Sequence, residues 1–160
     1  MEVPDGQAHA LRRTKASRRR NRACPLHRVD DVERSRHFYT EVLGGKVVFR
    51  SGQLMYVALA NTFIIINVGG GPTDDKPTVT PETPRDPDRV SSFLNIRVED
   101  IHARYAEWSA RGAEFLTPPK QHQYEIRCYI RDPDGHLIEV GQTTDAAGEW
   151  TAWLPSPSAS

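Results

Sequence analysis

The chain has 160 residues, which is enough for one domain with a sizeable hydrophobic core and too few for two ordinary domains. Its mean hydropathy of −0.60 indicates a water-soluble protein, and no run approaches the roughly 18 apolar residues of a membrane-spanning helix. The two cysteines, Cys24 and Cys128, lie far apart, so a disulfide framework is excluded and we expect a cytoplasmic protein without membrane contact.

The net charge of zero conceals an uneven distribution. Residues 1–28 hold eight of the 21 basic and two of the 21 acidic residues, which leaves 13 basic against 19 acidic residues in the remainder. A basic arm can contact nucleic acid, but no aromatic residue interleaves these arginines, so we do not expect that partner. Because this composition buries too little apolar area to offset chain entropy, residues 1–22 are predicted to be a disordered leader.

The first regular pattern surrounds a helix. Asp31 is a candidate N-cap, and apolar residues at helical spacing predict a helix over residues 32–43. Gly44 and Gly45 then end it. Three segments rich in Val, Ile and Phe follow and are predicted to be strands, over residues 46–49, 53–60 and 62–68.

The same order then recurs. A strand over residues 93–98 leads into a second helix over 100–111, which also opens at an Asp and ends at a Gly. Further strands are predicted over residues 113–116, 125–131 and 137–141. The sequence therefore predicts a repeated βαβββ unit.

Between the two halves lies a segment that contains five prolines, which predicts a stiff, extended connection. A functional lid is the alternative for this segment. The predicted domain spans residues 23–143, with module one at 23–68, the connection at 69–90 and module two at 91–143. Residues 144–160 are expected to form a loose tail.

The stretch VDDVERSRHFYTEVLGG, followed by three strands, a second helix opening at VEDI and the strand DPDGHLIEV, resembles the vicinal oxygen chelate superfamily. This group includes glyoxalases, bleomycin resistance proteins and extradiol dioxygenases. The resemblance covers roughly residues 29–142. It implies an α+β fold of two βαβββ modules that form a cup-shaped mixed sheet, usually in a homodimer.

In metal-using members of this superfamily, the Glu of the last strand binds a divalent cation inside the cup, and here that residue is Glu139. Two further ligands, usually His, precede the helix-opening Asp residues by seven positions, where this chain has Cys24 and Phe93. A fourth ligand position holds Ile65. Because one carboxylate and one thiol do not make a hard oxygen-and-imidazole site, we expect no metal and no cofactor.

The segment RNRACPLHR, where the first strand of module one should lie, carries a proline and several charges. Proline is poorly tolerated inside a sheet, so we expect either that this strand is frayed or that the true start of the protein differs from Met1. The role of Cys24 depends on how this segment folds. We also expect exposed positions for His37 and His102, and a buried apolar role for Cys128.

Strand alternation indicates which side chains share the cup face with Glu139. The candidate ligand-binding residues are Glu139, Phe93, Asn95, Ile65, Asn67, Cys24 and, from a loop over the cup mouth, His122. A mainly apolar cavity with a few polar groups is typical of a small-molecule site. We therefore predict a metal-free small-molecule binding protein of the bleomycin-resistance type.

Three alternatives remain open at this point. Glu139 could be the general base of a metal-free enzyme. The chain could be a metal-dependent lyase, isomerase or dioxygenase of the same superfamily. Finally, Glu139 could be structural and hydrogen-bonded across the module interface. Whether the protein is an enzyme is not decided by the sequence.

Overall fold

The computed structural model describes residues 23–144 of the chain. The predicted leader and, apart from residue 144, the predicted tail lie outside the described residues. The elements in chain order are β1 (Leu26–Val29), α1 (Val32–His37), η1 (Phe38–Val42), β2 (Lys46–Ser51), β3 (Leu54–Leu59), β4 (Thr62–Val68), β5 (Leu94–Arg97), α2 (Ile101–Ala110), β6 (Lys120–Gln121), β7 (Glu125–Arg131) and β8 (Leu137–Thr143). In this part of the chain, every helix is too short or too polar to cross a bilayer.

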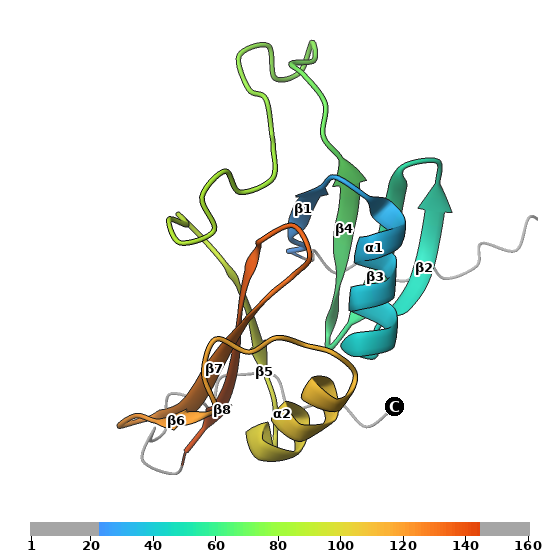
Figure 1. The fold of residues 1–160 in the computed structure, drawn as a ribbon. Coiled ribbons are helices and arrows are strands. Elements are labelled where there is room, and N and C mark those ends of the chain that lie inside the picture. Colours follow the sequence, from blue (N-terminus) through green and yellow to red (C-terminus); the bar gives the residue numbers. More distant parts are fainter. Residues whose placement is uncertain (1–22, 145–160) are drawn as a thin grey trace, which may run out of the picture.

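The strands form two separate four-stranded sheets with the same topology. Module one has the order β1-β4-β3-β2 and module two the order β5-β8-β7-β6. In each sheet the first strand runs parallel to the last, and the other neighbours are antiparallel. The predicted α+β fold of two βαβββ modules is confirmed, and both sheets are open (Figure 1).

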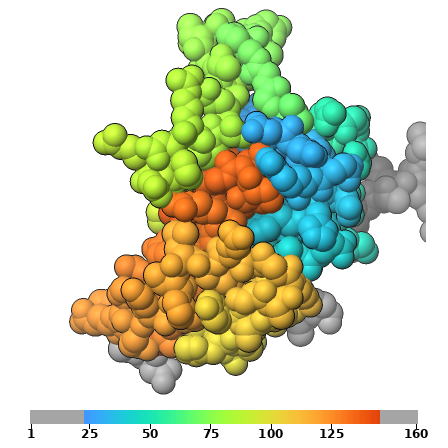
Figure 2. Space-filling view, viewed as in Figure 1, coloured from blue at the N-terminus to red at the C-terminus, as the bar shows by residue number. Residues whose placement is uncertain are grey.

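The proline-rich connection leaves the end of β4, arcs away from both sheets and returns to β5 (Figure 1). In the space-filling view it forms the green projection above the two modules, which contact each other directly beneath it (Figure 2). The turn between β7 and β8 lies against β1 and α1, so the last strands of module two reach into module one.

Both helices begin as predicted. The Asp31 carboxylate accepts from the backbone N–H of Glu33 at 2.8 Å and of Arg34 at 3.2 Å, and Asp100 accepts from Ala103 at 2.9 Å. These contacts satisfy N–H groups that have no partner within a helix. The first helix is not α-helical throughout, because it continues as a single π turn, η1, before it ends at Gly44 with φ +79°.

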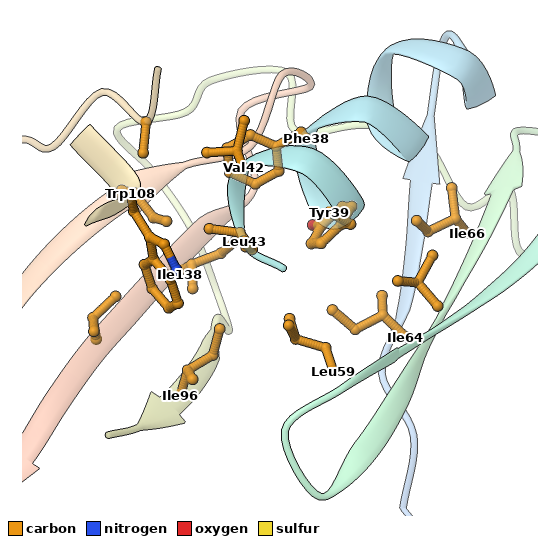
Figure 3. Close-up of a cluster of buried hydrophobic side chains, with 14 of the residues drawn as sticks. Phe38, Tyr39, Val42, Leu43, Leu59, Ile64, Ile66, Ile96, Trp108 and Ile138 are labelled. Atoms are coloured by element: carbon orange, nitrogen blue, oxygen red, sulfur yellow. The ribbon is translucent and has the colours of Figure 1, made fainter. Parts of the chain in front are cut away.

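The hydrophobic core joins the two modules through η1. Val42 and Leu43 lie toward Trp108 of α2, whereas Tyr39 lies toward Ile64 of β4 (Figure 3). All five belong to one buried cluster. Burial of each such side chain contributes about 1.5–3 kcal/mol, so the part of this cluster around η1 stabilises the packing of module one on module two.

Two sequence predictions about strands were wrong. The frayed first strand is in fact the regular β1, because Pro25 precedes it and the Pro25 carbonyl still accepts from Ile65 N at 2.9 Å. The predicted strand at 113–116 is reduced to an isolated bridge between Phe115 and Ile130, and the outer strand is β6. Pro118 and Pro119 follow directly and have no N–H to extend the ladder.

Candidate functional site

Each sheet has a face turned away from the helices, which we call its open face. In β4, Ile64 and Ile66 are fully buried in the core, so Ile65 and Asn67 lie on the open face. The cross-strand register then defines two equivalent rows. The module-one row is Leu26, Ile65 and Tyr56, and the module-two row is Asn95, Glu139 and Tyr129.

Glu139 is held by its two neighbours in the module-two row. Asn95 Nδ2 donates to one carboxylate oxygen and the Tyr129 hydroxyl donates to the other, both at 2.5 Å. The residue is only 5% exposed. Burial and the bond to Glu139 raise the pKa of Tyr129 to about 12, so the phenol keeps the proton that it donates. The carboxylate is therefore paired within module two and not across the module interface.

Phe93 and Asn95, the predicted neighbours of Glu139, lie with it in module two. The ring of Phe93 packs edge-on against Tyr129, with ring centroids 6.1 Å apart, and is half-exposed. Ile65 and Asn67 belong to the open face of module one. Phe93, Asn95 and Glu139 are thus brought together. Ile65 and Asn67 lie instead on the open face of the other sheet.

Cys24 and His122 lie apart from that group. Cys24 precedes β1 and is partly buried, with Sγ 3.7 Å from the Thr62 hydroxyl. His122 is exposed between β6 and β7, and it lines a separate cavity of about 490 Å³ together with Glu125 and Arg127. Burial alone would raise the pKa of Glu125, but hydrogen bonds from Arg97 and Arg127 lower it.

The four positions that correspond to the superfamily's metal ligands do not fit a divalent cation. The side chains of Phe93 and Ile65 are hydrocarbons and cannot ligate. Both Glu139 oxygens already accept hydrogen bonds from groups of their own sheet. A single carboxylate with a single thiol offers too few donors for Zn²⁺, Mn²⁺ or Ni²⁺.

A cavity of about 400 Å³ opens where the edge of β1 meets the edge of β5. Its lining is mainly apolar and also includes Asn95 and two imidazoles; the lining residues are Pro25, Leu26, His27, Pro84, Val90, Ser92, Phe93, Leu94, Asn95, His136 and Leu137. Asn95 thus connects the Glu139 carboxylate to this cavity. The size and the apolar lining with few polar groups suit one small molecule.

One of the two imidazoles belongs to a buried chain of hydrogen bonds. The Tyr39 hydroxyl donates to Asp132 Oδ2 at 2.8 Å, and His27 Nδ1 lies 2.8 Å from the same hydroxyl oxygen. Burial and the Asp132 charge raise the pKa of Tyr39 well above its usual value. Burial alone would raise the pKa of Asp132, but nearby His27 and His136 and the Tyr39 hydroxyl lower it. We call His27, Tyr39 and Asp132 the relay.

The turn that precedes β8 holds Asp132, the carboxylate of the relay, in position. Asp132 Oδ1 accepts from the backbone N–H of Asp134 at 3.0 Å and of His136 at 2.8 Å, which fixes the turn. His136 Nε2 bonds to the carbonyl of Arg28 in β1 at 2.7 Å, and its ring stacks on His27 with centroids 4.3 Å apart. The DPDGH segment therefore joins module two to module one.

A possible metal site apart from Glu139 must also be considered. The potential ligand atoms of His27, Asp132 and His136 lie within 4.8 Å of one another. Imidazole binds a metal through a lone pair in the plane of the ring. The two rings are stacked with an interplanar angle of 17°, so their lone pairs cannot converge on one ion. His27 Nδ1 is also occupied by Tyr39. The cluster fits a hydrogen-bonded relay better than a metal centre.

Sequence analysis missed the relay. His27 lay in the segment predicted to be frayed, and Asp132 was interpreted only as part of a turn. A signal was nevertheless present, because Tyr39 falls on the apolar stripe of a helix. A tyrosine that is buried normally needs a partner for its hydroxyl. His37 and His102 are exposed and Cys128 is buried, as predicted.

Two βαβββ modules that pack against each other define a class of proteins that includes both enzymes and binding proteins. Residues 25–140 match the Glyoxalase/Bleomycin resistance protein/Dioxygenase superfamily, and the chain belongs to that superfamily.

Solved structures agree with the fold. A glyoxalase/bleomycin resistance protein/dioxygenase from Nocardioides has a TM-score of 0.60 at 20% identity, covering 77% of this chain and 82% of the other. One from Alicyclobacillus acidocaldarius has a TM-score of 0.64 at 15% identity, covering 78% and 92%. TioX from Micromonospora sp. ML1 has a TM-score of 0.63 at 16% identity, covering 78% and 99%. At these identities the likeness concerns the fold alone.

Proposed function

We propose that the protein binds a small, mainly apolar molecule in the cavity between the modules and does so without a metal. Asn95 is the polar anchor at the module-two side of this cavity. Glu139 and Tyr129 act through Asn95, because the bond from Asn95 Nδ2 to Glu139 fixes the orientation of the amide. The remaining N–H and the carbonyl oxygen of Asn95 are then available to a ligand.

The observation that carries this proposal is the state of Glu139. A carboxylate that serves as a metal ligand or a general base must offer a lone pair to the metal or the substrate. Here each oxygen accepts one hydrogen bond, from Asn95 and from Tyr129, and the residue is almost fully buried, so its remaining lone pairs have little access to a cation or a substrate. Glu139 is therefore better suited to hold Asn95 than to bind a cation or take a proton.

The lining of the cavity supports an apolar ligand. Leu26 and Phe93, on facing sheet edges, are 46% and 50% exposed, which is high for large hydrophobic residues. Covering such surface with a ligand releases about 25 cal/mol for each Å² of apolar area. The module-one row continues this apolar surface, because the ring of Tyr56 stacks on Phe63 with centroids 5.2 Å apart.

The first test uses 4-methylanisole, a neutral aromatic ether, as the probe. Equilibrium dialysis should show saturable binding to the wild type, and Phe93→Ala should weaken it about fivefold or more through lost apolar contact. Tyr124→Ala is the matched control, because Tyr124 is equally exposed but lines the separate cavity at the far end of β7. Equal losses in both variants, or no binding to the wild type, would contradict the proposal.

The second test concerns the metal. Titration with Zn²⁺, Mn²⁺ and Ni²⁺ should give the same affinities for the wild type and for Glu139→Gln, with no dependence of probe binding on EDTA. Glu139→Gln should also weaken binding of the probe, because a neutral amide holds Asn95 less firmly than a carboxylate does. Tight, stoichiometric metal binding that is lost in Glu139→Gln would favour a metal-dependent lyase, isomerase or dioxygenase instead.

A further inference from the structure

We propose that His27 is a ligand-binding residue of the same cavity, and that its Nε2 accepts a hydrogen bond from an acidic hydroxyl of the ligand, such as that of a phenol. This inference rests on the proposed binding function and adds the chemical class of the ligand. The observations behind it come from the relay, and none of the relay residues was among the predicted site residues.

The first step is the tautomer of His27. Tyr39 has one hydroxyl proton and donates it to Asp132, whose pKa is lowered and which is therefore an acceptor only. The contact of 2.8 Å between His27 Nδ1 and the Tyr39 oxygen must then be a hydrogen bond donated by Nδ1–H. In the neutral imidazole, the lone pair consequently lies on Nε2.

The second step is the position of that lone pair. His27 lines the cavity, and its side chain is 10% exposed although the relay beneath it is buried. Among the described residues, no group forms a hydrogen bond with Nε2. The ring itself cannot rotate freely, because His136 stacks on it and is tied to the Arg28 carbonyl. Nε2 is thus a fixed acceptor.

The third step is the chemistry of the ligand. The Asp132 carboxylate oxygen lies 3.8 Å from His27 Nδ1, so its negative charge makes Nε2 a stronger hydrogen-bond acceptor. The most favourable partner is a donor that is itself weakly acidic. The rest of the lining is apolar, apart from Ser92, Asn95 and the two imidazoles. An aromatic ring with a hydroxyl group combines these properties, whereas an ether of the same ring lacks the donor.

The test compares p-cresol with 4-methylanisole at pH 7, where both are neutral. The measured quantity is the ratio of their two dissociation constants in equilibrium dialysis. In His27→Asn this ratio should shift against p-cresol by roughly 3- to 10-fold, the worth of one hydrogen bond. His27→Asn is chosen because its amide can still donate to Tyr39 while the acceptor at Nε2 is lost. His102→Asn, on the exposed face of α2, is the control and should leave the ratio unchanged.

The readout separates a binding role from a structural one. If His27 only maintains the fold, His27→Asn weakens both probes equally and the ratio stays at the wild-type value, which would overturn this inference alone. If neither probe binds the wild type, the cavity itself is not a binding site and the proposed function fails with it. Tyr39→Phe gives a second check, because it leaves Nε2 in place and leaves the Asp132 carboxylate within reach of Nδ1, so the ratio should change less than it does in His27→Asn.

Discussion

The substitution Tyr39→Phe removes a single hydroxyl group, but we expect it to lower the free energy of unfolding substantially. That hydroxyl makes two buried hydrogen bonds, one with ionised Asp132 and one with His27. A bond to a charged group contributes about 1.5–3 kcal/mol and a neutral one about 0.5–1.5 kcal/mol. Because His27 Nδ1 lies only 3.8 Å from Asp132, a small shift can restore part of the loss. We expect a net cost of about 2–3 kcal/mol.

Urea unfolding of the two proteins at pH 7 measures this difference, with Tyr56→Phe as the matched control. Tyr56 lies on the open face, and its replacement should change the free energy of unfolding by no more than about 0.5 kcal/mol. For a domain of this size the same cost lowers the melting temperature by roughly 6–15 °C. A Tyr39→Phe variant as stable as the wild type would show that the relay does not satisfy the buried charge of Asp132.

Four further outcomes are expected. The pKa of Asp132 is lowered by folding, so its contribution to stability is present above about pH 4 and is lost as the pH falls through the folded value; Asp132→Asn should flatten the acid limb of a urea-unfolding series between pH 5 and pH 2. Asp134 accepts from Asp30 N at 2.8 Å and from Ser35 Oγ at 3.0 Å, so Asp134→Ala should cost about 1–3 kcal/mol in the same assay by loosening the two modules. Burial raises the pKa of Cys128 to about 11, so a thiol reagent should modify Cys128 only in denaturant; rapid labelling of this thiol in the folded protein would contradict that assignment. The homodimer implied by the resemblance stays a prediction, and light scattering that gives a monomer at tens of micromolar, a roughly chosen concentration, would count against it.

The fold was predictable because local signals and the repeat agreed. Asp31 and Asp100 mark the two helix starts, and both form the caps that their positions in the sequence indicate. Alternation along β4 and β8 placed Ile65 and Glu139 on equivalent faces. The strand at 113–116 was overestimated because local composition was weighed without the two prolines that follow it, which set the limit of the ladder.

The site was only partly predictable. Strand alternation indicates which residues share one face of a sheet, but it does not indicate contacts between the modules. The neighbours of Glu139 followed from strand alternation, since Asn95 pairs directly with it. The relay could not be deduced in that way, because it depends on contacts between residues that are far apart in the sequence. Tyr39 lies in the first helix of module one and Asp132 in a turn of module two, 93 positions further along the chain. Contacts of this kind are set by how the modules pack, which no periodicity within one strand encodes.

The two rows suggest how one fold can carry different chemistry in its halves. Tyr56 and Tyr129 occupy equivalent positions at one end of each row, yet Leu26 and Ile65 in module one are replaced by Asn95 and Glu139 in module two. A buried carboxylate costs several kcal/mol unless it is hydrogen-bonded. Asn95 and Tyr129 supply those bonds to Glu139, so a buried carboxylate is tolerated in the module that has both partners. The module-one row lacks an amide at the position of Asn95, and its apolar character follows from that difference. The two row residues that line the cavity therefore present hydrocarbon at Leu26 and an oriented amide at Asn95.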